Sequence, residues 1–189
     1  MKAGPAIRFL PREFYMRDAR VVARALVGTY LVHGDRVGRI VETEAYCGRA
    51  DLACHAKVGL TKRTRTLYGP PGHAYVFLVY GMHECFNVVC FGEGRGHAAL
   101  VRAVEPVRGV AGVYDSDGRA VATADLVAGG ALGIGPRTQR PRIAVSARVG
   151  VAYAGEIAEA PWRFFDASSK HVSRPPARMV GLGPAGRTS

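Results

Sequence analysis

The sequence predicts an α+β fold, a single mixed domain in which a curved, mainly antiparallel β-sheet is surrounded by helices and carries one protruding hairpin. Its length of 189 residues suits one domain that buries most of the surface exposed by the unfolded chain. Several β-rich runs follow one another across short turns, which favours antiparallel pairing. A capped amphipathic helix near the N-terminus provides one element to cover the sheet.

The expected elements follow in a simple order. Residues 17–28 have apolar side chains at helical spacing, with Asp18 placed to cap the start of a helix and Gly28 placed to end it. Residues 61–69 are basic and are expected to form a helix or loop, and residues 107–141 are expected to form surface helices and loops. Strands are expected over residues 29–33, 36–46, 73–80, 84–91, 97–106, 143–154 and 161–165.

The composition also indicates the extent of the domain. Residues 1–174 are expected to form it, because no internal repeat or long linker divides them. Residues 175–189 are basic and rich in Pro and Gly, and they are expected to form a disordered tail. One hydrophobic core is therefore expected.

The net charge of +11 at pH 7 indicates a polyanionic partner. Nucleic acid is favoured over a membrane, because the sequence contains no basic amphipathic helix and no apolar stretch long enough to span a bilayer. Enrichment of Arg by a high-GC genome is the alternative explanation of this charge.

Four cysteines, Cys47, Cys54, Cys85 and Cys90, lack the spacing of a structural zinc site, because six residues separate the first pair and four separate the second. No metal is therefore expected. The N-terminal segment has no apolar core typical of a signal peptide, so a reducing, bacterial-type cytoplasm is the expected location.

Two glutamates lie one residue apart in the segment VETEAY, inside a run that otherwise resembles a buried strand. Because side chains alternate across a strand, Glu42 and Glu44 are expected on one face, ~6.6 Å apart. Ile40 and Tyr46 are expected on the same face. Two carboxylates at roughly this separation can act as acid and base in the cleavage of a glycosidic bond.

A structural role is the alternative for each glutamate. Arg39, Arg102 or another arginine would neutralise a buried carboxylate within the fold. For Glu42 this alternative is favoured, because buried acids are usually paired.

The strongest hairpin signal comes from the runs HAYVFLVY and ECFNVVCF on either side of GMH. Tyr75 and Phe77 share one strand face, where core packing is the simplest explanation. Tyr80 stands just before Gly81, where the chain must turn, and an aromatic side chain at a turn is exposed. On a protein of this charge, Tyr80 suits a wedge that enters a base stack and holds open the gap left by an extruded nucleotide.

Seven segments between about Arg8 and Ser173 match one family in order. They are ARALVGTYLV, GRIVETEAYCG, DLACHA, YGPPGHAYVFLVYGMHECFNVV, LVRAVEP, ARVGVAYAGE, and WRFF followed by VS. The chain resembles the alkyladenine DNA glycosylases, also called 3-methyladenine or methylpurine DNA glycosylases. The ETEAY core and the YGM tip are its most specific pieces.

The resemblance implies a monofunctional glycosylase for base-excision repair of alkylation damage. Such enzymes flip damaged purines out of duplex DNA and hydrolyse the N-glycosidic bond without metal or cofactor, which leaves an abasic site. The expected lesions are 3-methyladenine and 7-methylguanine, with hypoxanthine and ethenoadenine as further candidates. Glu44 matches the general base that activates the attacking water, while Arg102 and the backbone carbonyl of Val149 match further contacts of that water.

The same resemblance implies a pocket for the flipped base. Tyr46 and Phe77 match two aromatic side chains that sandwich the base, and the backbone of His55 is expected to address its edge. Asn87 and Leu100 match wall residues that clash with the exocyclic amino group of guanine and so reject normal bases.

Damaged double-stranded DNA is the expected partner, and a monomer the expected state. Tyr80 matches the intercalating wedge, with Met82 beside it at the hairpin tip. Lys62, Arg63 and Arg65 are the candidates for phosphate contacts, although a basic run can also be a merely solvated surface. The protein is then expected on the nucleoid when it is bound to DNA.

The chain departs from the family pattern at two places. Phe77 stands where relatives place Tyr, so stacking is kept but a hydroxyl hydrogen bond is absent. After Val110 the chain is short, because residues 129–139 replace a longer stretch of the Gly-Pro-Gly-Lys-Leu type. Differences in lesion range, affinity or stability are expected from this segment.

Two rival functions stay open at this point. A non-catalytic nucleic-acid-binding protein of the same fold would explain the charge and the aromatic residues, but it would leave Glu44 without a role. A hydrolase of free nucleosides or sugars would keep the two carboxylates but would need neither Tyr80 nor a basic surface.

Overall fold

The computed structural model describes residues 8–79, 83–108 and 125–173. The strands are β1 (Tyr30–His33), β2 (Arg36–Cys47), β3 (Ala74–Val79), β4 (His83–Cys90), β5 (His97–Arg108), β6 (Leu132–Gly135), β7 (Ile143–Ser146) and β8 (Arg163–Asp166). The α-helices are α1 (Arg12–Tyr15) and α2 (Ala19–Leu26). Four 3-10 helices complete the described elements: η1 (Gly48–Ala50), η2 (His55–Val58), η3 (Thr66–Tyr68) and η4 (Ala152–Glu159).

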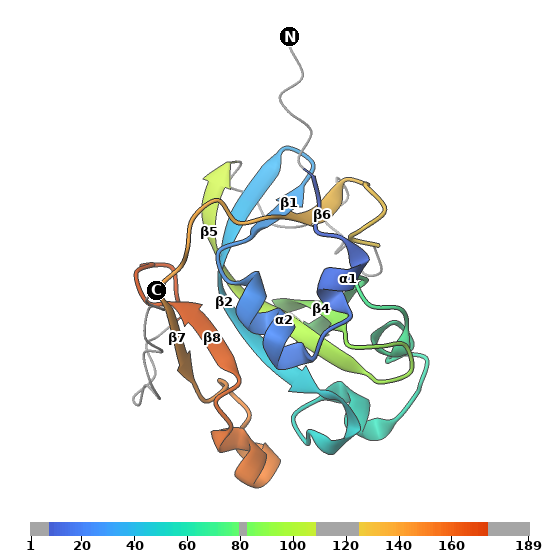
Figure 1. Ribbon diagram of the computed structural model, residues 1–189. Coiled ribbons are helices and arrows are strands. Elements are labelled where there is room, and N and C mark those ends of the chain that lie inside the picture. Colours follow the sequence, from blue (N-terminus) through green and yellow to red (C-terminus); the bar gives the residue numbers. More distant parts are fainter. Residues whose placement is uncertain (1–7, 80–82, 109–124, 174–189) are drawn as a thin grey trace, which may run out of the picture.

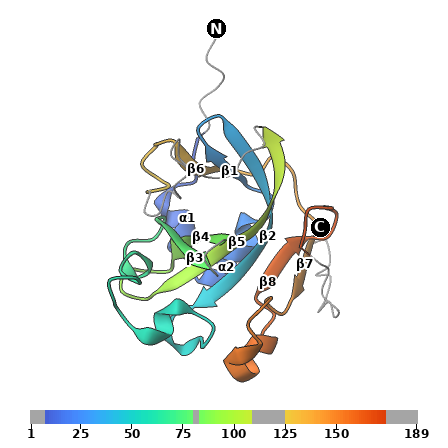
Figure 2. The same cartoon turned by 180° about the vertical axis from the view of Figure 1, so that it is seen from behind.

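The strands form one antiparallel sheet that curls around α1 and α2 (Figures 1 and 2). The order along the sheet is β3-β4-β5-β2-β1-β6, and β8 pairs with both β2 and β7. All pairings between the described strands are antiparallel. The predicted α+β fold with a curved antiparallel sheet is therefore confirmed, and β3 and β4 form the predicted hairpin.

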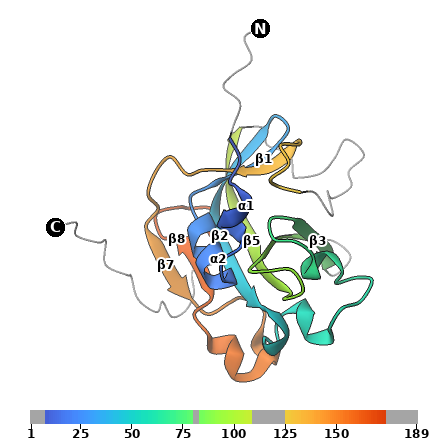
Figure 3. The ribbon, with the colours of Figure 1, turned by 45° about the vertical axis from the view of Figure 1, so that its right-hand side comes forward.

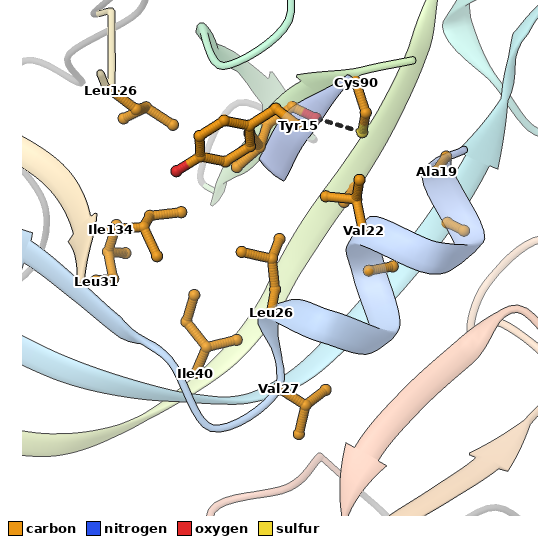
Figure 4. Packing of buried hydrophobic residues seen from close by; sticks show 14 of the residues in the cluster. Tyr15, Ala19, Val22, Leu26, Val27, Leu31, Ile40, Cys90, Leu126 and Ile134 are labelled. Atoms are coloured by element: carbon orange, nitrogen blue, oxygen red, sulfur yellow. Dashed lines mark hydrogen bonds between the residues drawn. The ribbon is translucent and has the colours of Figure 1, made fainter. Parts of the chain in front are cut away.

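The helix predicted over residues 17–28 is α2. The Asp18 carboxylate caps it by accepting a hydrogen bond from a backbone N–H of the first turn at 2.9 Å. Gly28 follows the helix with a φ of +89°, a conformation that favours glycine. One face of α2 packs on the sheet, where Val22 and Leu26 are fully buried in the main core (Figure 4).

A β-bulge in β2 separates the core from the side of the sheet that carries the glutamates. The register with β5 shifts after Ile40, which leaves Val41 as an extra residue before Glu42. Ile40 packs in the main core, and the Thr43 hydroxyl donates a hydrogen bond to the carbonyl of Ala23 in α2 at 2.7 Å. Glu42 therefore points away from α2, and the prediction that Ile40 shares its face was wrong, because the bulge resets the alternation.

Two segments differ from their predictions. The strand predicted over residues 143–154 ends at Ser146, and η4 follows after a turn in which Gly150 has a φ of +76°. Residues 107–141 include, in their described part, the short strand β6 rather than only helices and loops. Gly133 lets the Phe9 ring lie directly against β6, because a Cβ atom at this position would collide with that ring. Glycine has low β-propensity, so the pattern did not reveal this strand.

Some expectations fall outside the described residues, namely the tail over 175–189 and the hairpin tip with Tyr80 and Met82. None of the described helices is long and apolar enough to cross a membrane. The four cysteines are free thiols. Within the described ranges, no group of three or more His, Cys, Asp or Glu side chains is arranged to hold a metal ion.

Candidate active site

A cavity of about 340 Å³ lies on the side of the sheet that faces away from α2. Its lining residues belong to β2, the segment between β2 and β3, strands β3 to β5, the turn before η4, and η4 itself. Figure 3 shows β2, β3 and β5 among these elements in the ribbon. The predicted site residues that line the cavity are Tyr46, His55, Phe77, Asn87, Leu100, Arg102 and Val149. An open groove of about 730 Å³ beside Phe9 has no carboxylate among its lining residues, so it offers no comparable base.

Glu44 is fully buried behind this cavity, and each of its carboxylate oxygens accepts a hydrogen bond. The backbone N–H of Val149 donates to Oε1 at 2.8 Å, and the hydroxyl of Tyr46 donates to Oε2 at 2.9 Å. The Nε atom of Arg102 lies 3.8 Å from Oε1. Both donors line the cavity, so the carboxylate is held in one orientation directly behind its wall.

Burial is the largest influence on the acidity of Glu44, and it raises the pKa of this carboxyl above its ordinary value. The hydrogen bond from Val149, the charge of Arg102 and the hydrogen bond from the Tyr46 hydroxyl lower the pKa, but they do not cancel the effect of burial. A carboxylate with a raised pKa is a stronger base near neutral pH. Such surroundings would suit a general base.

Glu42 is also fully buried, but its carboxylate is enclosed by partners. Nε of Arg163 donates to Oε1 at 2.7 Å, and Nε of Arg102 lies 3.2 Å from the same oxygen. The backbone N–H of Ser173 donates to Oε2 at 2.7 Å, and the Ser173 hydroxyl lies within 2.8 Å of both oxygens. The prediction that an arginine neutralises Glu42 is confirmed, whereas Arg39 instead pairs with Glu105 and Asp166.

Aromatic rings form one side of the cavity. The ring centroids of His55 and Phe77 are 4.2 Å apart, and those of Tyr75 and Phe77 are 5.4 Å apart. Nδ1 of His55 lies 3.0 Å from the hydroxyl of Tyr75. Burial lowers the pKa of His55, and the nearby charges of Arg63 and Lys57 lower it further, so these surroundings disfavour the protonated imidazole.

Asn87 and Leu100 form another part of the wall, because they are direct neighbours across β4 and β5. The Asn87 amide nitrogen donates hydrogen bonds to the carbonyls of Tyr75 and Cys85, each at 3.1 Å. These two bonds use both N–H groups of the amide and fix its orientation. Asn87 is thus a rigid part of the wall.

Comparison with known proteins identifies the family to which the chain belongs. Residues 13–134 match the sequence model of the family described as Methylpurine-DNA glycosylase (MPG). The chain belongs to this family. A protein from Myxococcus xanthus named "Putative 3-methyladenine DNA glycosylase" is 48% identical over 190 residues, which cover 91% of this chain and 98% of the relative.

Two further relatives carry the same name. One from Legionella pneumophila (strain Lens) is 41% identical, over 89% of this chain and its own entire length. Another from Methanocella arvoryzae is 42% identical, over 87% of this chain and 96% of its own length. These alignments extend beyond the family match at residue 134, so the similarity is not confined to the part of the chain that carries Glu44. Membership of a DNA glycosylase family implies a DNA substrate.

The basic residues proposed for DNA contact lie on one turn between η2 and η3. Lys62, Arg63 and Arg65 are exposed, while Thr64 between them is buried. The Thr64 hydroxyl donates a hydrogen bond to the carbonyl of Gly59 at 2.9 Å, which anchors the turn. The three cations therefore project from a fixed loop, and Arg63 lies near enough to His55 to influence its pKa.

Some residues around the site were not predicted from the sequence. Arg163 and Ser173, the partners of Glu42, are more than 120 positions away in the chain and gave no local signal. Both nevertheless lie in the matched segments WRFF and VS, so the resemblance contained the information. Tyr153 was also missed, although it lines the cavity and is 68% exposed.

Proposed function

We propose that this methylpurine-DNA glycosylase family member is a monofunctional DNA-3-methyladenine glycosylase. It removes alkylated purines, such as 3-methyladenine and 7-methylguanine, from duplex DNA by hydrolysis of the N-glycosidic bond. The observation that carries this proposal is the buried Glu44 carboxylate, held by Val149 and Tyr46 behind a cavity with aromatic walls. A nucleic-acid-binding protein without catalysis would not need such a carboxylate.

In the proposed reaction, Glu44 accepts a proton from a water molecule while the water oxygen bonds to C1′ of the damaged nucleotide. The bond between C1′ and the purine nitrogen breaks, and its electron pair leaves with the base. Arg102, close to both glutamates, and the carbonyl of Val149 are the proposed further contacts of the water. Placement of the water next to C1′ supplies most of the rate, because the leaving base is already activated.

The aromatic walls suit the charge of the proposed substrates. A purine alkylated at N3 or N7 carries a positive charge, and stacking of such a cation on an aromatic ring contributes ~1 kcal/mol or more in a desolvated pocket. Tyr46 and Phe77 both line the cavity, and they are the proposed stacking partners. Hypoxanthine and ethenoadenine are neutral and must be protonated to leave, so they are further candidates rather than the first choice.

Incubation of the protein with a panel of lesion-containing duplexes, followed by alkaline cleavage of abasic sites, tests this function. We expect strand breaks at 3-methyladenine or 7-methylguanine, and a rate ~10²–10⁴-fold lower for Glu44→Gln. Glu93→Gln is the matched control, because Glu93 is exposed and does not line the cavity. If the wild-type protein releases no base from any lesion, the glycosylase proposal fails and a binding protein is favoured.

A further inference from the structure

Arg148 is a buried cation next to the cavity to which the proposed reaction assigns no role. Its side chain is completely buried, as is that of its partner Asp51. The two groups form two hydrogen bonds, of 2.6 Å from Nη1 to Oδ2 and of 3.0 Å from Nη2 to Oδ1. This bidentate geometry fixes the plane of the guanidinium group.

The guanidinium group of Arg148 lies between two aromatic rings. Its central carbon is 4.8 Å from the ring centroid of Tyr46 and 4.9 Å from that of Trp162. One face of the Tyr46 ring is therefore occupied by a cation, which restricts how this ring can tilt. The same Tyr46 side chain lines the cavity and donates its hydroxyl hydrogen bond to Glu44.

The Arg148 and Asp51 pair also joins separate segments around the site. Arg148 donates to the carbonyl of Ala45 in β2 at 3.0 Å, and the Asp51 carboxylate accepts from the backbone N–H groups of Cys47 and Ala53, each at 3.0 Å. Val149 directly follows Arg148 in the chain, and its backbone N–H donates a hydrogen bond to Glu44 at 2.8 Å. Arg148 therefore contacts both donors that orient the Glu44 oxygens: it stacks on the ring of Tyr46, and it is bonded to Val149 through the backbone.

Stability alone does not explain this arrangement. A buried ion pair often contributes no more than well-packed apolar side chains would, because both charges lose their hydration. In the described part of the chain, the Nε–H of Arg148 also meets no acceptor, and an unsatisfied buried N–H costs ~1–3 kcal/mol. A role in positioning the groups around Glu44 would explain why this energetic cost is tolerated.

We propose that Arg148, held by Asp51, is a positioning residue that sets the orientation of the Glu44 carboxylate and of the Tyr46 ring together. It touches neither the water nor the flipped base. This inference rests on the proposed function for its kinetic consequence, but its structural consequence for Glu44 can be measured without any activity.

The substitution Arg148→Lys isolates this role. It keeps the positive charge, but an ammonium group cannot form the planar bidentate pair or stack between two rings. The charged and titratable groups around Glu44 are Glu42, Tyr46, Cys85, Arg102, Arg148 and Arg163. None of them changes its charge in this variant, so a change in the titration of Glu44 reports altered hydrogen bonding.

Carbon-13 NMR of the glutamate carboxyl groups, with Glu44→Gln to assign the signal, measures the titration of Glu44 directly. Loss of the aligned hydrogen bonds from Val149 and Tyr46 disfavours the carboxylate, so we expect the midpoint in Arg148→Lys to rise by ~0.5 pH units or more. The pH dependence of single-turnover excision is measured with 7-methylguanine, a cationic lesion that needs no acid. We expect the acidic limb of this rate profile to move to higher pH by the same amount as the Glu44 midpoint. The maximal rate falls by ~10²-fold, while affinity for lesion DNA changes far less.

Arg39→Lys is the matched control, because Arg39 is also an ion-paired arginine, but its partners Glu105 and Asp166 are not the groups that orient Glu44. It is expected to lower the melting temperature without moving the Glu44 midpoint. If Arg148→Lys does not fold, Trp162→Leu removes one ring from the stack, and we expect a smaller shift in the same direction.

An unchanged Glu44 midpoint in the folded variant overturns the proposal. The proposal is also overturned if the excision rate of Arg148→Lys equals that of the wild type once both rates are expressed per folded molecule. Absence of activity in the wild-type protein refutes the proposed function instead, and the NMR titration then still decides whether Arg148 orients Glu44.

Discussion

Glu42 and Glu44 lie one residue apart on β2, both fully buried, yet their surroundings differ. Glu42 contacts the charged Arg163 and Arg102 and also Ser173, each within 3.2 Å. Among the residues that the structure describes, the hydrogen-bond donors within 3 Å of Glu44 are neutral, and burial raises the pKa of Glu44. Neighbouring carboxylates on one strand therefore have different environments: Glu42 is held in ion pairs within the fold, and Glu44 suits the proposed role of proton acceptor.

The largest expected effect is on stability, from Glu42→Gln. This change removes the charge of Glu42 from its ion pair with the buried Arg163, and breaking such a pair costs ~3–5 kcal/mol. Urea denaturation measures this loss. Glu105→Gln is the control, because the carboxylate of Glu105 is 34% exposed and its ion pair with Arg39 contributes only ~0–1 kcal/mol. Equal losses in the two variants would contradict a structural role specific to Glu42.

Tyr46 connects Glu44 to the cavity, and two substitutions separate its functions. Tyr46→Ala removes the ring and is expected to weaken binding of lesion DNA by ~1–3 kcal/mol. Tyr46→Phe keeps the ring but removes the 2.9 Å hydrogen bond to Glu44, so it lowers the excision rate with little change in binding. Fluorescence anisotropy in a Glu44→Gln background measures binding without turnover. Equal affinities of the two variants would exclude Tyr46 as a stacking partner.

The raised pKa of Glu44 has a smaller effect, on the pH dependence of stability. A carboxyl whose pKa is higher in the folded state than in the unfolded state stabilises the fold at low pH, and this contribution is lost as pH rises through the folded-state pKa. The free energy of unfolding is measured for the wild type and for Glu44→Gln from pH 4 to 8. As pH rises, we expect the wild type to lose stability relative to Glu44→Gln. A pH-independent difference would contradict the buried environment of Glu44.

The smallest expected effect concerns the basic turn. Replacing Arg63 or Arg65 with Ala removes one phosphate contact, so the slope of log affinity against log salt concentration is expected to fall by ~0.9. Arg24→Ala is the control, because Arg24 is exposed on α2, on the other side of the sheet. Titrations of duplex DNA at several salt concentrations measure the slopes. A common slope for all variants would show that this turn is a solvated surface.

Local patterns in the sequence predict much of the fold and site. The Asp18 cap, the alternation in β3 and β4, and the matched motifs were sufficient for α2, for the hairpin and for the residues around the cavity. The bulge at Val41 could not be predicted, because an extra residue in a strand can be recognised only once the pairing with the partner strand is known. The pair of Glu42 with Arg163 was not predictable from pattern either, because it depends on β8 reaching β2.

The contrast between the two glutamates is tested most directly by single-turnover excision of 7-methylguanine from duplex DNA, with rates expressed per folded molecule. We expect Glu44→Gln to fold, to bind the lesion and to excise it ~10²–10⁴-fold more slowly than the wild type. The folded fraction of Glu42→Gln is expected to retain most of the rate. Substantial excision by Glu44→Gln, or equal loss in both variants, would contradict the assignment of Glu44 as the base.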